Sequence, residues 1–512
     1  MKLPDQVDVL VVGGGINGAG IARDAAGRGL SVLLVEQDDL AMHTSSHSSK
    51  LIHGGLRYLE YYEFRLVREA LIEREVLLAA APHIVWPLNF VLPHSPEQRP
   101  AWMIRLGLFL YDHLGVRRTL PGSRSVDLRQ GPLGAALQPR FEHGFTYSDC
   151  WVDDARLVVL NAVGAAARGA TILTRTRCAG ARREGGLWRA ELDGPEGRRE
   201  VRARALVNAT GPWVQRFIQD ELGLATRYGV RLVKGSHIVV PKLYEGEHPY
   251  ILQNDDGRVV FVIPFERDFS LIGTTDLPFE GEAGTVAISA EETAYLCRAV
   301  NRYFRRQIAP ADAVWSFAGV RPLYDDARAN VSAVTRDYVF DLDAAAGRAP
   351  LLSIFGGKIT TYRKLAEHAL AKLAPHLGNV APRWTATAPL PGGDMPGADF
   401  DAYLGGLKSA YPWLPAALAL RYARAYGTWT ERILRGASGL AGLGEHLGEG
   451  LYAAEVDYLM RHEWANSPED LLWRRSKLGL HLGRETQARL AQWMARVEAP
   501  AGRAPAGRTA VV

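Results

Sequence analysis

Three glycines near the start of the chain, Gly13, Gly15 and Gly18, have a spacing that can bring backbone amides close to a pyrophosphate. The first allows a tight turn, the second allows the backbone to approach the phosphates, and the third allows a helix to pack closely on a strand. Because the chain has 52 glycines in 512 residues, chance alone produces this spacing about once in every two such chains. The surrounding elements therefore decide whether the motif is meaningful.

The residues around these glycines predict a strand, a helix and a second strand. Residues 7–12 are a short valine-rich run, residues 16–28 carry small apolar residues on one helical face, and residues 31–35 are again apolar. Glu36 ends the second run, where it can accept hydrogen bonds from an adenosine ribose. This context predicts a dinucleotide-binding unit with the pyrophosphate at the N-terminus of the helix. It does not distinguish FAD from NAD, because both contain the same ADP half.

Three cations stand next to glycine or proline turns, where the backbone can approach a ligand. Arg57 follows a Gly-Gly pair, and Lys358 follows another one between a predicted strand end and a helix. Arg321 precedes a proline in a segment that we expect to run from a short strand into a turn. A single arginine is more often a solvated surface residue than a ligand, so position alone assigns none of them a function.

Length and composition exclude several classes of protein. The chain of 512 residues is long enough for roughly two to three domains. Its 60 Lys plus Arg against 56 Asp plus Glu leave a net charge of +4, which argues against nucleic-acid binding. The three cysteines, Cys150, Cys178 and Cys297, lack the spacing of disulfide frameworks or metal ligands, so we expect no metal and a reducing compartment. Neither a signal peptide nor an uncharged apolar run of about 18 residues is present.

A second group of motifs extends along most of the chain. Residues 44–60 (TSSHSSKLIHGGLRYLE) resemble the signature that follows the dinucleotide motif in the FAD-dependent glycerol-3-phosphate dehydrogenases. The resemblance runs from residue 7 to about residue 493 and is close to the aerobic, respiratory type found in bacteria. Further matching segments follow in the same order: 147–158 (YSDCWVDDARLV), 207–214 (VNATGPWV), 234–241 (KGSHIVVP), 251–264 (ILQNDDGRVVFVIP), 272–276 (IGTTD), 319–323 (GVRPL) and 355–367 (FGGKITTYRKLAE).

The resemblance implies a fold, a cofactor and a reaction. The fold is α/β, with a Rossmann-like FAD-binding domain of the glutathione reductase and amino-acid oxidase type, a mixed-sheet substrate cap and a C-terminal helical domain. The reaction is oxidation of sn-glycerol 3-phosphate to dihydroxyacetone phosphate by hydride transfer to FAD, with electrons passed to ubiquinone or another membrane quinone. The residues leave open an oxidase that uses oxygen, an amine oxidase of the same fold, and a non-enzymatic FAD-containing binding module.

The resemblance also assigns residues to the substrate. A phosphate dianion needs fixed cations, and a secondary hydroxyl needs a base as the hydride leaves its carbon. By resemblance, Arg57, Arg321 and Lys358 line the substrate site, with Tyr58 and His237 nearby. We expect His237, placed at a strand edge, to be the base, because an imidazole titrates near neutrality. The alternative is that Arg321 stabilises the developing alkoxide while the proton leaves elsewhere.

For FAD, the resemblance points to four segments. These are the glycine motif with the end of the second strand, the serine-rich loop after it, the turn after a strand at 205–207, and the glycine turn before a helix at about residue 360. The predicted FAD contacts are Gly13, Gly15, Asn17, Gly18, Glu36, Thr44, Ser45, Ser46, Ser49, Lys50, Leu51, His53, Gly54, Gly55, Ala209, Thr210, Gly211, Gly357, Lys358, Thr360 and Thr361.

The alternation of these motifs predicts a flavin domain that is interrupted by a cap. A proline- and glycine-rich linker then leads to helical patterns at 414–426 and 451–464 and to a helix start at Ser467. The expected role of that last domain is structural support or contact within a homodimer. The predicted parts are 1–84, 147–229 and 325–382 for FAD, 85–146 and 230–324 for the cap, 398–498 for the helical domain and 499–512 for a disordered tail.

Residues 99–118 (RPAWMIRLGLFLYDHLGVRR) surround an apolar helical pattern with arginines. Aromatic and basic residues in this arrangement suit a phospholipid headgroup boundary, although a buried cap helix fits equally well. With a quinone as the implied acceptor, we expect a peripheral protein on the cytoplasmic face of the inner membrane. The apolar residues are Trp102, Met103, Ile104, Leu106, Leu108, Phe109 and Leu110.

Overall fold

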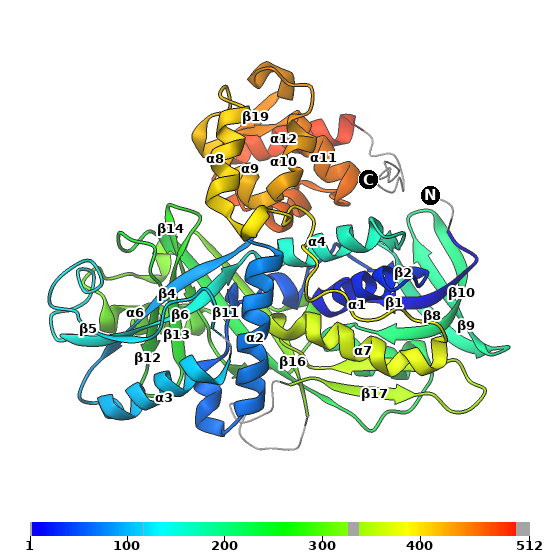
Figure 1. Cartoon of the computed structure of the whole chain (residues 1–512), viewed down its shortest axis with the longest axis horizontal. Coiled ribbons are helices and arrows are strands. Elements are labelled where there is room, and N and C mark those ends of the chain that lie inside the picture. Colours follow the sequence, from blue (N-terminus) through cyan, green and yellow to red (C-terminus); the bar gives the residue numbers. More distant parts are fainter. Residues whose placement is uncertain (1–2, 116, 326–336, 498–512) are drawn as a thin grey trace.

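The computed structural model describes residues 3–115, 117–325 and 337–497. Within them, two large sheets lie side by side, and a helical domain packs above the junction between them (Figure 1). The predicted tail at 499–512 lies outside the described residues.

The first sheet is mainly parallel and buried on both faces, as its valine- and leucine-rich strands favour. β1 pairs in parallel with β10 on one side and with β2 on the other, so Val11 lies between Val207 and Leu34. Its strands are β17 (Val339–Asp343), β18 (Leu351–Phe355), β10 (Gly197–Asn208), β1 (Gln6–Val12), β2 (Val32–Val35) and β7 (Thr171–Leu173), with the hairpin β8 (Arg177–Glu184) and β9 (Leu187–Gly194) paired to β10.

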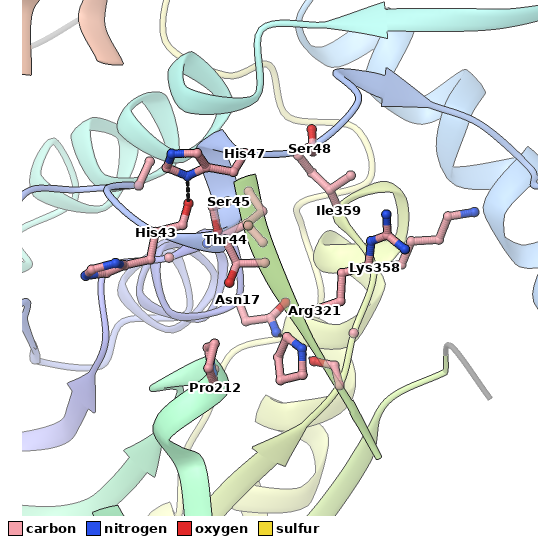
Figure 2. Close-up of a pocket in the computed structure, with 18 of the residues that line it drawn as sticks. Asn17, His43, Thr44, Ser45, His47, Ser48, Pro212, Arg321, Lys358 and Ile359 are labelled. Carbon is pink, nitrogen blue, oxygen red and sulfur yellow. Dashed lines mark hydrogen bonds between the residues drawn. The ribbon is translucent and has the colours of Figure 1, made fainter. Parts of the chain in front are cut away.

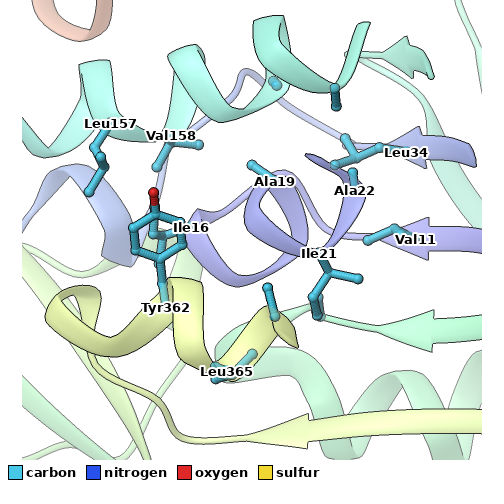
Figure 3. Close-up of a cluster of buried hydrophobic side chains, with 14 of the residues drawn as sticks. Val11, Ile16, Ala19, Ile21, Ala22, Leu34, Leu157, Val158, Tyr362 and Leu365 are labelled. Carbon is cyan, nitrogen blue, oxygen red and sulfur yellow. The ribbon is translucent and has the colours of Figure 1, made fainter. Parts of the chain in front are cut away.

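Three helices cover one face of this sheet. α1 (Ile16–Gly27) lies between α4 (Asp154–Ala166) and α7 (Tyr362–Leu377), and its small side chains allow both neighbours to approach closely (Figure 3). Ala19 and Ala22 are fully buried in the resulting core. This layer fixes the direction of α1, whose N-terminus points to the end of β1.

The second sheet is mostly antiparallel and forms the cap side of the molecule. α6 (Ala290–Tyr303) covers one face, while α2 (Phe64–Ala80) and α3 (Ala101–Leu114) contribute to the core on the other. Its strands are β15 (Leu277–Pro278), β11 (Val230–Pro241), β14 (Phe269–Gly273), β13 (Val259–Phe265), β12 (Tyr250–Gln253), β4 (Val85–His94), β6 (His143–Val152) and β3 (Leu51–Ile52), with β16 (Trp315–Tyr324) paired to β11 and β5 (Arg124–Asp127) paired to β6.

The C-terminal domain has a core of its own, to which every one of its α-helices contributes. The predicted helix start at Ser467 is confirmed, since its hydroxyl accepts from the N–H of Asp470 (3.2 Å). The elements are α8 (Phe400–Ala410), α9 (Ala416–Tyr426), α10 (Thr430–Leu434), β19 (His446–Gly448), β20 (Leu451–Tyr452), α11 (Ala453–His462), η12 (Asp470–Arg475) and α12 (Arg484–Arg496).

Short helices at the sheet junction complete the fold. Each of them is only three to six residues long, so the segments between the strands remain mostly loops. Loops of this kind can wrap around a ligand. Those used below are η1 (Thr44–Ser46), η2 (Leu56–Tyr61), η3 (Gly211–Trp213) and η8 (Ile359–Thr361).

Several local predictions are confirmed, and two are corrected. The strand–helix–strand unit is present within one residue of its predicted limits. His237 was expected at a strand edge, but β11 is paired on both sides and His237 lies between Gly273 and Phe317. Arg321 was expected in a strand-to-turn segment, yet it lies within β16, which continues to Tyr324. The predicted domain limits stay a prediction; β3 and β6, which fall wholly or partly in the predicted flavin segments, pair within the second sheet.

Candidate active site

A single cavity of about 540 Å³ receives side chains from both sheets. Its wall contains the start of α1, the loop that includes η1, residues of η2, and parts of β11 and β16. Figure 2 shows side chains from α1, the η1 loop, β16 and the start of η8 around one space, with His43 on one side and Lys358 on the other. The glycine motif and the three predicted cations therefore share one cavity.

The turn between β1 and α1 is too tightly packed for side chains at two of its glycines. Gly13 has a φ of +111°, and a Cβ there would lie 2.5 Å from the carbonyl oxygen of Ala209. A Cβ on Gly18 would lie 1.9 Å from the carbonyl oxygen of Gly13. Gly18 thus permits the close approach of helix and turn, whereas Gly13 and Gly15 line the cavity itself.

The N-terminus of α1 presents unused polar groups to the cavity. Among the described residues, no hydrogen bond engages the backbone N–H of Gly15 or Asn17. The Asn17 amide donates to the carbonyl of Gly356 (3.3 Å), while its Oδ1 is buried without a partner in the described part of the chain. Free N–H groups at the positive end of a helix fit an anionic pyrophosphate.

Glu36 lies on the same wall after β2. Its carboxylate accepts from the N–H groups of Gly14 (2.6 Å) and Asp38 (2.8 Å). Burial raises the pKa of Glu36, and the two N–H groups oppose that rise. Carboxylate oxygens have further lone pairs, so this fixed group can still accept from a ribose hydroxyl.

The serine-rich loop is anchored to its surroundings before any ligand is present. The Ser45 hydroxyl accepts from the N–H of Ile16 at the start of α1 (3.0 Å). Lys50 does not reach the cavity wall, because its Nζ is buried and pairs with Asp154 (2.7 Å). Lys50 was a predicted FAD contact; here it holds the loop from behind.

Three cations reach the cavity from three separate elements. Arg57 belongs to η2, Arg321 to β16, and Lys358 immediately precedes η8. The Lys358 Nζ donates to the carbonyl of His53 (2.9 Å) and lies 4.9 Å from the ring centre of Tyr58. This arrangement can hold a phosphate ester, since Arg and Lys are the side chains that bind phosphate oxygens most strongly.

Arg321 is oriented by the neighbouring strands. Its Nη1 forms an ion pair with Asp276, and its Nη2 donates to the Thr274 hydroxyl (3.3 Å). The proline that follows it is tolerated because β16 is an edge strand, whose outer N–H groups need no strand partner. The guanidinium thus keeps a defined direction while part of it remains exposed to the cavity.

His237 lies on the wall in a neutral state. Burial, together with the positive charges of Arg321 and Lys50, lowers its pKa well below 6.5. The Nε2 atom lies 2.9 Å from the Ser49 hydroxyl, and the ring stacks on Phe317. The Nδ1 atom is buried with no partner among the described residues. A neutral imidazole of this kind can accept a proton at pH 7.

Most of the predicted contacts lie on the cavity wall, and six do not. Those on the wall are Gly13, Gly15, Asn17, Glu36, Thr44, Ser45, Ser49, Leu51, His53, Gly55, Arg57, Tyr58, Ala209, Thr210, Gly211, His237, Arg321, Gly357 and Lys358. Those behind it are Gly18, Ser46, Lys50, Gly54, Thr360 and Thr361.

Several residues of the cavity wall were not predicted from the sequence. Asp276 and Thr274 orient Arg321, and both fall in the quoted segment 272–276, which could have drawn attention to them. The wall also includes Thr176, whose N–H donates to the carbonyl of Glu36 (2.7 Å), and Trp213, whose ring centre lies 4.8 Å from that of His43. Trp213 falls in the quoted segment 207–214, which could have drawn attention to it, whereas no sequence signal singles out Thr176, because chain folding alone brings that residue to the cavity.

Two family models cover most of the chain. The model described as FAD dependent oxidoreductase matches residues 8–363, and the model of the C-terminal domain of alpha-glycerophosphate oxidase matches residues 383–499. A glycerol-3-phosphate dehydrogenase of Pseudomonas aeruginosa is 62% identical over 494 residues, which are 96% of each chain. The chain belongs to the FAD-dependent glycerol-3-phosphate dehydrogenase family. As a member of this family it is an oxidoreductase, and the predicted cofactor, FAD, is confirmed.

Two further proteins are similar to this chain, one in sequence and one in solved structure. A D-erythritol 1-phosphate dehydrogenase of Brucella abortus is 56% identical, covering 96% of this chain and 98% of the relative. The structure of the glycerol-3-phosphate dehydrogenase from Bacillus halodurans complexed with FAD is 28% identical, with a TM-score of 0.76 over 96% of this chain and 90% of that one. The predicted fold class is thereby confirmed.

Proposed function

We propose that this chain oxidises sn-glycerol 3-phosphate to dihydroxyacetone phosphate and passes the electrons to a membrane quinone. The observation that carries the proposal is the convergence of Arg57, Arg321 and Lys358 on the cavity that also contains the N-terminus of α1. An amine substrate would not require this set of cations. The names of the similar dehydrogenases support the same substrate.

The three cations bind the phosphate and orient the carbon chain. Arg321 presents a guanidinium that Asp276 and Thr274 already hold, so little conformational entropy is lost when the phosphate arrives. Lys358 supplies a point charge beside the ring of Tyr58. FAD, when bound, supplies the acceptor for the hydride that leaves the carbinol carbon.

The proton of the secondary hydroxyl goes to His237. Its ring is neutral because burial and nearby cations lower its pKa, and Ser49 contacts its Nε2 from the cavity wall. Arg321 lies close enough to His237 to depress that pKa, so the same guanidinium can stabilise the developing alkoxide. The two roles that the sequence left open are compatible in this arrangement.

An anaerobic titration tests the reaction directly. Glycerol 3-phosphate should bleach the yellow protein without oxygen, and a quinone analogue should restore the colour faster than oxygen does in stopped flow. No bleaching would favour a binding module without catalysis. Reoxidation by oxygen at the higher rate would instead indicate an oxidase.

D-erythritol 1-phosphate is the second candidate substrate. The dehydrogenase named for it covers the same length of chain at 56% identity, and both substrates carry a phosphate ester and a secondary hydroxyl. The ratio of kcat/KM for the two compounds decides between them. A ratio in favour of D-erythritol 1-phosphate would replace the first proposal.

We further propose that α3 contacts a phospholipid surface. Its exposed side chains recur at helical spacing on one face, and Trp102 is 65% exposed. Two of the flanking arginines are engaged by carboxylates, Arg99 with Glu60 and Arg117 with Asp112, so apolar contact contributes more than charge. No helix in the described ranges is long and apolar enough to cross a bilayer. The exposed apolar residues are Trp102, Met103, Leu106, Phe109 and Leu110.

A further inference from the structure

Residues 53–58, here called the strap, run from the end of β3 into the first residues of η2 and carry two of the proposed substrate contacts. Arg57 and Tyr58 reach the cavity from its end. At its start, the carbonyl of His53 accepts from Lys358 Nζ (2.9 Å) and from the Thr360 hydroxyl (3.3 Å). The position of the strap therefore decides where two of the three cations stand.

The strap packs tightly against elements behind it. Gly55 adopts a φ of +83°, which favours glycine, and so turns the chain toward η2. A Cβ on Gly54 would lie 2.6 Å from the Tyr111 hydroxyl oxygen and 2.7 Å from Leu71 Cδ2. The backbone at Gly54 consequently touches α2 and α3 directly.

A buried chain of hydrogen bonds ends on this backbone. Arg74 Nη1 donates to Asp149 Oδ1 (2.7 Å), and the Tyr111 hydroxyl lies 2.8 and 2.9 Å from the two Asp149 oxygens. The N–H of Gly54 donates to the Tyr111 oxygen at 2.8 Å and approaches Asp149 Oδ1 at 3.4 Å. Arg74, Tyr111 and Asp149 are each at most 4% exposed. Such a network is rigid, because every broken bond leaves a buried polar group unpaired.

In this hydrogen-bonded network, the ionisation of the side chains determines which group donates each hydrogen bond and which group accepts it. Burial raises the pKa of Tyr111 well above 10, so the phenol keeps its proton. The phenol donates a hydrogen bond to the Asp149 carboxylate, which Arg74 holds in place. The phenol oxygen can then accept from the N–H of Gly54 in the strap. The backbone N–H of Gly54 has no other acceptor as close among the described residues.

We propose that Tyr111 and Asp149 are positioning residues for substrate binding. They hold the strap at Gly54 and thereby place Arg57 and the His53 carbonyl that anchors Lys358. Neither side chain lines the cavity, so they act on the substrate only through the strap. The expected effect of Tyr111 and Asp149 on substrate binding rests on the proposed function. Their effect on the order of the strap is independent of the substrate.

Hydrogen exchange measured by mass spectrometry tests the ordering without any substrate. In the FAD-loaded Tyr111→Phe variant, peptides covering residues 53–58 should exchange faster, because the aromatic ring stays packed while the acceptor for Gly54 is lost. Tyr244→Phe is the matched control: Tyr244 is also buried, and its hydroxyl donates to the carbonyls of His248 (2.6 Å) and Val262 (3.3 Å) rather than to a strap residue. Unchanged exchange in the strap of Tyr111→Phe would overturn the proposal.

A double-mutant cycle tests the consequence for catalysis. Tyr111→Phe should raise KM for glycerol 3-phosphate about fivefold, the effect of one hydrogen bond, with kcat within about twofold and FAD content unchanged. In an Arg57→Ala background the same substitution should change KM less, since one of its two routes to the substrate has been removed and only the route through the His53 carbonyl and Lys358 remains. If Tyr111 only supports the fold, Tyr111→Phe should lower the melting temperature and leave KM unchanged. That result would contradict the proposal.

The two experiments separate two kinds of failure. If the wild-type protein does not oxidise glycerol 3-phosphate, the proposed function fails. Hydrogen exchange in the strap then still decides whether Tyr111 orders it. If it does oxidise the substrate and the KM effects of Tyr111→Phe and Arg57→Ala simply add, the inference fails and the proposed function stands.

Discussion

Arg321 and His237 differ from ordinary surface residues in how their neighbours prepare them. The guanidinium of Arg321 is directed by Asp276 and Thr274, and the imidazole of His237 is kept neutral by burial and by nearby cations. Both effects exist without a ligand, so the substrate meets a site that is already arranged. This preorganisation gives two predictions at the scale of single residues.

Arg321→Ala should lower kcat/KM for glycerol 3-phosphate at least tenfold while FAD stays bound. A charge-assisted contact is worth about 1.5–3 kcal/mol, and the substitution also removes the ion pair between Arg321 and Asp276. Steady-state kinetics and the visible flavin spectrum measure the two quantities. Arg258→Ala is the matched control, because Arg258 pairs with Asp256 and does not itself line the cavity. Wild-type kinetics in Arg321→Ala would remove this residue from the site.

His237→Gln should lower kcat by a factor of about 10² to 10⁴, the usual contribution of a general base. Because the pKa of His237 is depressed, the ring is already neutral above pH 6.5, and activity should not fall between pH 8 and 6.5 through its protonation. A profile of kcat against pH in both proteins checks this expectation. His248→Gln, at a buried histidine outside the cavity, is the control. A variant with unchanged kcat would leave Arg321 as the remaining candidate for stabilising the alkoxide.

At the scale of elements, α3 combines two opposite faces. Its buried side contributes Leu108 and Tyr111, while five apolar residues on the other side remain exposed. The neighbouring Tyr62 (81% exposed) and Phe64 extend this apolar character to the start of α2. One face thus contacts the strap at Gly54 and the other is available to a lipid surface.

Replacing Trp102 and Phe109 together by serine should weaken binding to phosphatidylethanolamine–phosphatidylglycerol vesicles by at least tenfold. Each aromatic side chain that is transferred from water contributes about 1.5–3 kcal/mol. Sedimentation with vesicles measures the partition. The double variant Val314→Ser with Leu420→Ser is the control, because it removes exposed apolar residues of other elements. Equal sedimentation of all three proteins would exclude α3 as the contact surface.

At the scale of the whole molecule, the C-terminal domain is joined to the flavin side by buried charges. Asp39, in the loop after Glu36, accepts from Arg474 Nε (2.6 Å) and from Arg475 Nη1 and Nη2 (2.7 Å each). Arg156 of α4 pairs with Glu463 in the same seam. None of the described residues of the helical domain lies on the cavity wall, so this domain can influence FAD only through the segments that it contacts, among them the loop that contains Asp39 and helix α4.

Asp39→Asn should destabilise the protein by about 3–5 kcal/mol, because two buried arginines lose part of their compensation. The loss should also release FAD at a lower temperature, since the loop after β2 lines the cavity. Flavin fluorescence during a thermal ramp records the release. The control is Asp457→Asn, which breaks an exposed pair with Arg461 and should cost less than about 1 kcal/mol. Similar release temperatures in both variants would contradict a role for the seam in holding FAD.

The sequence by itself determined the features that depend on near neighbours in the chain. The strand–helix–strand unit, the glycine motif and Glu36 could be predicted because hydrophobic periodicity and glycine spacing act over about 30 residues. The family followed from ordered motifs, and the comparisons confirm it. The three cations could be proposed only through the family resemblance, and neither their directions nor the position of Arg321 inside β16 could be predicted.

Tertiary structure alone decided the partners of these residues. Asp276 is 45 positions from Arg321, Asp149 is 95 from Gly54, and Asp39 is 436 from Arg475. His237 lies in the interior of a sheet because β14 and β16, both distant in sequence, pair on either side of it. A one-dimensional pattern contains no information on which distant strands pair, so burial, and with it the pKa of His237 and the rigidity of the strap, follows only once the chain has folded.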